Sequence, residues 1–331
     1  MRNNGLFLHL AAALWLLPII MGPSLNAQLS GSSRRAIDDP LGKQKSRVIE
    51  VRDPYAVRGT DVYLELMTRM LNTGICELSG YTDPNVAWRT YLHQDDVIAL
   101  KFNRIASREF GTNKAMAGVL LDILYGIGFS PDQFLIVGLD QLPEQAAGTR
   151  KFTYGWQREQ ADFGSGSDHL ATWVSEVTAI VNIPTFMDDN VTGLRGAMAN
   201  VTWPLMKSPA RPQHFLACGD PFIPEVYALA EIQGKIRLTI ANGLHVLYYG
   251  GPIVDKRFAA ERQAVVFCDD PVAMDRIGLE MIRNFRRTLI MPEGVDPKIN
   301  AGYLLTAEAM GIGYQDFNLI DYRWIRPDKL K

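Results

Sequence analysis

Residues 97–140 read VIALKFNRIASREFGTNKAMAGVLLDILYGIGFSPDQFLIVGLD, and the fold class follows from their pattern. Two short apolar runs, residues 97–100 and 134–137, enclose a segment at 114–127 whose apolar side chains recur at helical spacing. Gly128 follows that segment and is typical of a helix end. A strand, a helix and a second strand in this order indicate two parallel strands joined by a helical crossover.

The same alternation continues on both sides of this stretch. The expected elements are strand 47–51, helix 61–73, strand 177–181, a helical stretch within 187–206, strand 236–240, strand 264–267 and helix 272–285. We therefore predict an α/β protein with a largely parallel or mixed sheet, helices on both faces and a single domain over residues 47–325. Residues 164–167, GSGS, are expected to form a loop.

The N-terminus has the features of an export signal. Arg2 supplies a positive charge, residues 6–21 are almost continuously apolar, and Ala27 is a small residue suited to a cleavage point. The apolar run is shorter than the roughly 20 residues that a transmembrane helix needs. We predict a Sec-type signal peptide at 1–27 and a flexible leader at 28–46. The protein is then periplasmic or extracellular, with no stable membrane span after cleavage. An uncleaved anchor is the alternative.

Composition narrows the classes of partner and cofactor. The 331 residues include 34 Lys or Arg and 36 Asp or Glu, a formal charge of −2. That balance gives no basic surface for nucleic acid. The three cysteines, Cys76, Cys218 and Cys268, form no CxxC pair, so no iron–sulfur cluster is expected. They leave open either one disulfide or three buried thiols. No dinucleotide or phosphate-loop motif stands at a strand–helix junction, so no cofactor is evident.

Polar residues follow the predicted strands at the points where the strands end. Ligands of open α/β sheets bind at the carboxyl ends of the strands, so these side chains should face one crevice if the strands are parallel neighbours. The alternative is that each polar residue caps the helix or turn that follows it. The candidate ligand-binding residues are Lys101, Asn103, Asp140, Asn182, Asn242, His245, Asp270 and Asp275.

Acidic side chains indicate a second kind of candidate site, one that binds a metal ion. Asp188, Asp189 and Asp270 are candidates for holding a divalent cation, because such cations prefer hard oxygen ligands. The alternative is that Asp270 caps a helix that has Pro271 in its first turn, and that the other acids are solvated.

Several ordered motifs make the chain similar to a known family. They are VNIP at 181–184 with Gly193, CGDP at 218–221, KIRLTI at 235–240, YGGP at 249–252, DPVAMD at 270–275 and the stretch 303–313. With VIALKFN at 97–103 as the first strand, the chain resembles the domain-of-unknown-function family 362 over residues 47–321. The resemblance implies no settled activity. Some members carry ferredoxin-like cysteine motifs, which this chain lacks.

The resemblance also marks departures. After the Asn-x-Pro motif the family pattern has lysine, aspartate and histidine, and a lysine–asparagine pair follows on the next helix. The corresponding residues here are Met187, Asp188, Asp189, Ala199 and Asn200. The missing cationic residues imply a lost or changed function, with a pocket that favours cations or neutral ligands.

Three functions are compatible with the sequence. We favour an exported protein that binds a small ligand or a divalent cation at the carboxyl-terminal edge of its sheet. The second function is an enzyme that uses Lys101, Asp140, Asp270 or His245 as acid–base groups. The third is an accessory subunit of an exported redox or surface complex, with another exported protein as its partner.

Overall fold

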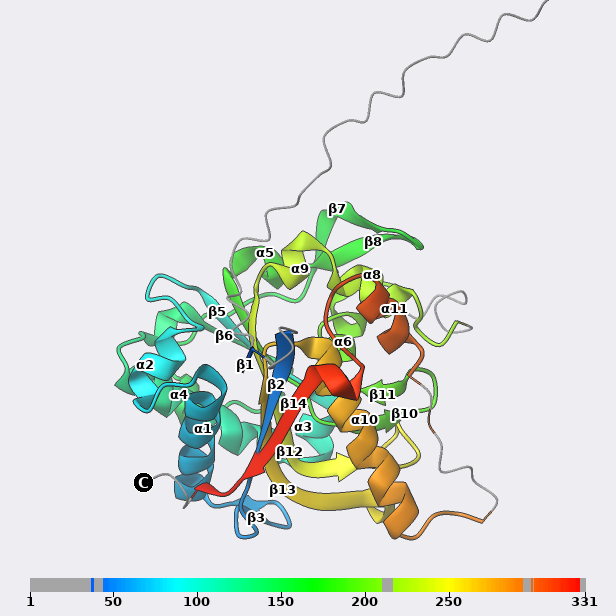
Figure 1. Ribbon diagram of the computed structural model, residues 1–331. Helices are drawn as coiled ribbons and strands as arrows, with labels where there is room; N and C mark the ends of the chain where they lie inside the picture. The colour runs from blue at the N-terminus through cyan, green and yellow to red at the C-terminus, as the bar shows by residue number, and fades with distance from the viewer. Residues whose placement is uncertain (1–36, 39–43, 210–216, 294–298, 300, 328–331) are drawn as a thin grey trace, which may run out of the picture. The chain divides into compact units, whose positions relative to one another are not determined.

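The apolar runs form one mixed sheet in the computed structural model, which describes residues 37–38, 44–209, 217–293, 299 and 301–327 (Figure 1). The strands are β1 (Ile37–Asp38), β2 (Gln44–Arg52), β3 (Val57–Arg58), β4 (Asp61–Val62), β5 (Ile98–Phe102), β6 (Phe134–Val137), β7 (Trp156–Phe163), β8 (Gly166–Ala171), β9 (Ala179–Ile183), β10 (Met187–Asp189), β11 (Gly193–Arg195), β12 (Ile236–Leu247), β13 (Ala259–Cys268) and β14 (Ile320–Ile325). The main strand order is β1-β2-β13-β12-β9-β5-β6. β14 pairs with β2, β10 with β12 and β11, and β3–β4 and β7–β8 form separate two-stranded sheets.

Most strands of the main sheet run in one direction. β6, β5, β9 and β12 are parallel neighbours, and β14 is parallel to β2. β13 runs antiparallel to both β12 and β2, so it is the reversed strand inside the main path. This confirms the predicted α/β fold with a mixed, largely parallel sheet.

Helices cover both faces of the sheet. They are α1 (Leu64–Ser79), α2 (Pro84–Arg89), α3 (Arg104–Phe110), α4 (Thr112–Gly126), α5 (Trp173–Glu176), α6 (Ala197–Asn200), α8 (Phe222–Tyr227), α9 (Ala230–Gln233), α10 (Pro271–Thr288) and α11 (Tyr303–Ala309). Short 3-10 turns occur at Pro131–Gln133, Glu144–Ala146, Trp203–Leu205, Lys256–Phe258 and Phe317–Leu319. None of the helices in the described part of the chain is both long and apolar enough to cross a membrane.

The strands are apolar on both faces because both faces are packed. Ile98 and Leu100 of β5 belong to the core formed with α1, α2 and α4, whereas Ala99 between them belongs to the core formed with α6, α8, α10 and α11. Val265 and Val266 of β13 divide between the two cores in the same way. Figure 1 shows α1, α2 and α4 on one side of the sheet and α10 and α11 on the other. Alternate residues therefore face opposite cores, as a strand requires.

Four local expectations differ from the structure. β2 begins at Gln44, inside the segment expected to be a leader, and the predicted signal peptide lies outside the described residues. The expected helical stretch within 187–206 is the hairpin β10–β11 followed by the single turn of α6. Of the expected loop at 164–167, only residues 164–165 form a turn, that of the β7–β8 hairpin, and Gly166 and Ser167 already belong to β8. In residues 187–206 the apolar spacing fits a helix, but tertiary packing selects a hairpin. All three cysteines are free thiols, with Cys76 and Cys268 buried and Cys218 exposed.

One helix on each face approaches the sheet through a glycine. Gly74 of α1 lies against the ring of Phe267, and Gly278 of α10 lies against the ring of Phe186. A methyl group on either glycine would overlap the aromatic ring. The two glycines therefore set how closely α1 and α10 pack on the two faces.

Gly74→Ala and Gly278→Ala should each lower the free energy of unfolding by about 1–2 kcal/mol. Alanine adds about 0.5–1 kcal/mol of helix propensity, but overpacking a buried ring costs about 1–3 kcal/mol. Chemical denaturation measures the effect. The control is Gly126→Ala at the end of α4, which meets open space and should leave stability unchanged or slightly raised. Equal behaviour of all three variants would contradict this packing role.

Candidate functional site

A network of buried polar side chains joins the ends of two parallel strands to α6. Lys101 lies opposite Asn182 in the β5–β9 register, and its Nζ donates to the carbonyl oxygen of Phe102 at 2.8 Å and to Asn200 Oδ1 at 3.2 Å. Asn200 Nδ2 donates to Lys101 O at 3.1 Å and to Asn182 Oδ1 at 2.8 Å. Asn182 Nδ2 donates to Ala197 O at 2.8 Å. We call Lys101, Asn182 and Asn200 the Lys101 network.

Asp275 holds α6 from the side of α10. Its two carboxylate oxygens accept the backbone N–H groups of Ala197 and Met198, and Tyr303 donates its hydroxyl to the same carboxylate at 3.0 Å. Burial raises the pKa of Asp275 to about 7, and the three hydrogen bonds oppose that rise. Asp275 therefore fixes the position of α6, which carries Asn200 of the Lys101 network, from the interior of the protein.

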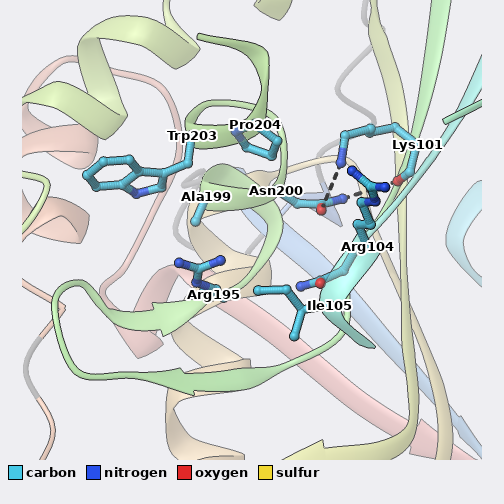
Figure 2. Close-up of a pocket in the computed structure, with 9 residues that line it drawn as sticks. Lys101, Arg104, Ile105, Arg195, Ala199, Asn200, Trp203 and Pro204 are labelled. Atoms are coloured by element: carbon cyan, nitrogen blue, oxygen red, sulfur yellow. Dashed lines mark hydrogen bonds between the residues drawn. The ribbon is translucent and has the colours of Figure 1, made fainter. Parts of the chain in front are cut away.

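A pocket opens beside the Lys101 network at the carboxyl ends of β5 and β9. Its volume is about 130 Å³, and its lining comes from β5, α3, β11, α6 and the 3-10 turn at Trp203–Leu205 (Figure 2). The lining residues are Lys101, Asn103, Arg104, Ile105, Arg195, Ala199, Asn200, Trp203 and Pro204. We call this cavity the Lys101 pocket.

The lining of the Lys101 pocket is cationic. Lys101, Arg104 and Arg195 contribute positive groups, and no carboxylate is among the lining residues that the structure describes. Arg104 pairs with Asp140 at 3.0 Å and Arg195 pairs with Asp189, and neither acid is among the lining residues. The lining is therefore positive, whereas we expected a pocket that favours cations or neutral ligands. Arg195 forms an ion pair with Asp189, and Ala199 adds a small apolar side chain to the lining.

Lys101 is a buried amine in this cationic setting. The residue is 3% exposed, and in the described chain it makes no ion pair with an acidic side chain. Burial lowers the pKa of Lys101 from its ordinary 10.5 to about 7, because the ammonium form loses its hydration. Near neutral pH the side chain can therefore hold or release a proton.

Asn103 and Asn242 belong to a neighbouring group of hydrogen bonds. Asn103 caps α3 by accepting the N–H of Ala106 at 3.1 Å, and it also lines the Lys101 pocket. Asn242 donates to Asn113 Oδ1 at 2.7 Å and to Thr112 Oγ1 at 3.1 Å, which ties β12 to the start of α4. Asn242 is thus next to the candidate site in the fold but outside its lining.

Two further candidates line separate hollows. Asp140 accepts from Arg104 and Arg108, which lower its pKa, and it lines a hollow of about 320 Å³ that also includes Lys114. His245 lines a hollow of about 250 Å³, where its ring stacks on Phe110 at 5.3 Å between centroids. Burial lowers the pKa of His245, so the neutral ring is favoured. Neither Asp140 nor His245 lines the Lys101 pocket.

Asp270 lies away from the Lys101 pocket. β13 is antiparallel and its last residue, Cys268, is opposite Thr239, with β9 and β12 between β13 and β5. At about 4.8 Å per strand, three spacings separate β5 from β13 by about 14 Å. Asp270 accepts the N–H groups of Val272 at 2.9 Å and Ala273 at 3.0 Å as the cap of α10. The expectation that Asp270 shares one crevice with Lys101 is therefore wrong, because β9 and β12 lie between β5 and β13 and the Asp270 carboxylate caps α10.

The three carboxylates proposed for a cation are not gathered in one place. Asp188 pairs with Arg286 at 2.5 Å, near the C-terminal end of α10, whereas Asp270 caps its N-terminal end. Sixteen residues of helix at 1.5 Å each separate positions 270 and 286 by about 24 Å. Asp189 pairs with Arg195 and accepts the N–H of Thr192 at 2.9 Å. Among the described residues no group of three potential metal ligands occurs.

Of the nine residues that line the Lys101 pocket, only Lys101 and Asn103 were candidate site residues, and the missed ones include Arg104, Arg195 and Trp203. Arg104 begins α3, Arg195 ends β11, and Trp203 lies in the turn after α6. The only sequence signal for Arg104 is its place one residue after Asn103, because the first helical position after a strand faces the same edge. Nothing in the local pattern marks Arg195 or Trp203, since both come from the stretch that we expected to be helical.

The buried amine of Lys101 should make stability depend on pH. Its folded pKa is below its unfolded value, so folding releases a proton between about pH 7 and pH 10 and stability rises with pH. Wild type should gain about 1.4 kcal/mol per pH unit relative to Lys101→Met across this range, and the difference should be flat below pH 7. Urea denaturation at several pH values measures it. Lys114→Met, which removes an exposed lysine of α4, should follow wild type. A parallel profile for Lys101→Met would contradict the buried neutral amine.

Comparison with known families agrees with the resemblance predicted from the motifs. A family model described as Domain of unknown function (DUF362) matches residues 151–280. The matched segment includes Asn182, Arg195, Asn200 and Trp203, whereas Lys101 lies before it. No curated protein sequence matches the chain. The segment from residue 151 to residue 280, which supplies five of the nine lining residues of the Lys101 pocket, is similar to the DUF362 family.

Proposed function

We propose that the protein binds a small anionic ligand in the Lys101 pocket. The observation that carries the proposal is the lining, in which Lys101, Arg104 and Arg195 face one cavity without a carboxylate among the described lining residues. Guanidinium groups suit carboxylate and phosphate because they donate two parallel hydrogen bonds. The same positive lining disfavours a divalent cation.

The size of the pocket limits the ligand. Its volume of about 130 Å³ is close to the roughly 150 Å³ of a cavity that holds a benzene-sized molecule. The ligand, or the part of it that enters, therefore has only a few heavy atoms. Trp203 and Ile105 add apolar surface to the wall, and Asn200 adds an amide. This combination suits a short organic acid or a single phosphate group.

The ion pairs of the two lining arginines also support the binding of an anion. Asp140 and Asp189 fix the guanidinium groups of Arg104 and Arg195 while leaving donors on each of them for a ligand, since a guanidinium has five N–H groups. Arg104 and Arg195 are only partly buried, with side-chain exposures of 54% and 32%. They can therefore reach a ligand from solvent without a large rearrangement.

Arg195→Gln should weaken binding of small anions at least tenfold, about 1.4 kcal/mol. Thermal-shift and Trp fluorescence titrations with phosphate, oxalate and glyoxylate at low ionic strength measure the affinity. The control is Arg158→Gln on the exposed β7, which should bind as wild type does. Undiminished binding by Arg195→Gln, or stronger stabilisation by divalent cations than by anions, would refute the proposal.

We also propose that this binding takes place outside the cytoplasm, after cleavage of the N-terminal signal. The support is the charged and apolar pattern of residues 2–21 with Ala27 after it. Expression of the full chain in a bacterium should give a periplasmic product whose first residue is Gln28. Intact-mass measurement of the periplasmic fraction tests this, and recovery of only the uncleaved chain in the membrane fraction would favour the anchor instead.

A further inference from the structure

We infer that Lys101 is a nucleophile that forms an imine with the carbonyl carbon of a small 2-oxo acid bound in the Lys101 pocket. This inference rests on the proposed function and names its substrate class. A 2-oxo acid combines a carboxylate, which the two arginines can bind, with an adjacent electrophilic carbonyl.

The hydrogen bonds of Lys101 match a neutral amine. Nζ has two acceptors, the carbonyl oxygen of Phe102 at 2.8 Å and Asn200 Oδ1 at 3.2 Å. A neutral amine has two N–H groups for these two acceptors and keeps one lone pair. An ammonium has three N–H groups, and the described residues offer only these two acceptors to Nζ. The geometry therefore favours the nucleophilic form.

The charged side chains that share the pocket with Lys101 are positive. Arg104 from α3 and Arg195 from β11 line the same cavity and offer no counter-ion to an ammonium group. The acids nearest in the fold are occupied, since Asp140 pairs with Arg104, Asp189 pairs with Arg195, and Asp275 binds the backbone of α6. Burial brings the pKa of Lys101 to about 7, so much of the amine is neutral at physiological pH.

The pocket places the amine next to the anion-binding groups. Figure 2 shows the Lys101 side chain reaching toward Asn200, with Arg195 and Trp203 on the far side of Asn200. All of these residues line one cavity of about 130 Å³. A short acid bound by a guanidinium therefore has its second carbon within the same small space as Nζ.

The reaction balances without another reactant. The Nζ lone pair forms a bond to the carbonyl carbon, and a proton moves from nitrogen to the carbonyl oxygen to give a carbinolamine. The second N–H proton then leaves with the hydroxyl group as water, and a C=N bond remains. One amine and one carbonyl compound thus give one imine and one water, with no change of oxidation state.

Reductive trapping tests the inference on the full chain. Wild-type protein is incubated with glyoxylate and sodium cyanoborohydride, which supplies the hydride only for trapping, and peptide mass mapping locates the adduct. We expect Lys101 to be modified at least tenfold faster than Lys235 at pH 7.5, with the rate at Lys101 rising to half its maximum near pH 7. Lys235 is the internal control because it is also partly buried, but it donates to Val174 O and lies outside the pocket. Excess phosphate should slow the modification of Lys101.

The outcomes separate the two proposals. If glyoxylate binds in thermal-shift titrations but Lys101 is modified no faster than Lys235, the nucleophile is refuted and the anion site stands. If neither phosphate nor glyoxylate binds and Lys101 is not modified, both fail. Lys101→Arg should lose the adduct. Because the comparison with Lys235 uses wild-type protein, it remains decisive even if that variant does not fold.

Discussion

The structure depends on one constraint, the need to pair every polar group that is buried where the parallel strands end. An unpaired buried donor or acceptor costs about 1–3 kcal/mol, so strand ends covered by packed elements need side chains that replace water. Lys101, Asn182 and Asn200 do this for β5, β9 and α6 through their mutual hydrogen bonds. Asp275 then secures α6 to α10. The pocket exists because this network holds α6 at the rim of the sheet.

Charge has two different uses in this molecule. On β2 the buried Glu50 accepts bidentate hydrogen bonds from Arg52 and Arg262. The charges of these three residues therefore serve to join strands. At the Lys101 pocket, by contrast, Asp140 and Asp189 each pair with an arginine that also lines the cavity. The first arrangement joins β2 to β13, whereas in the second the arginines also line a cavity. This difference is why we place function at the carboxyl-terminal edge and not at Glu50.

The candidate site could be predicted only in part. Lys101 and Asn103 follow directly from the rule that ligands bind after parallel strands, because both end β5 in the sequence and line the pocket in the structure. Asn182 was predicted for the same reason, although it takes part in the hydrogen bonds of the Lys101 network and does not line the pocket. The prediction for Asp270 was wrong because residue spacing cannot reveal strand order, and β12 and β9 separate β13 from β5. Arg195 and Trp203 could not be found, because a hairpin replaces the helix that their apolar neighbours indicate.

Local pattern was sufficient for the class of fold and for the longer elements. Continuous apolar runs such as 134–137 specify strands buried on both faces, and the spacings in 114–127 and 272–285 specify α4 and α10, because these are properties of neighbouring residues. Strand order, the reversal of β13 and the meeting of Lys101 with Asn200 are long-range outcomes. They depend on which faces pack and which buried polar groups find partners, and such pairings join residues about a hundred positions apart.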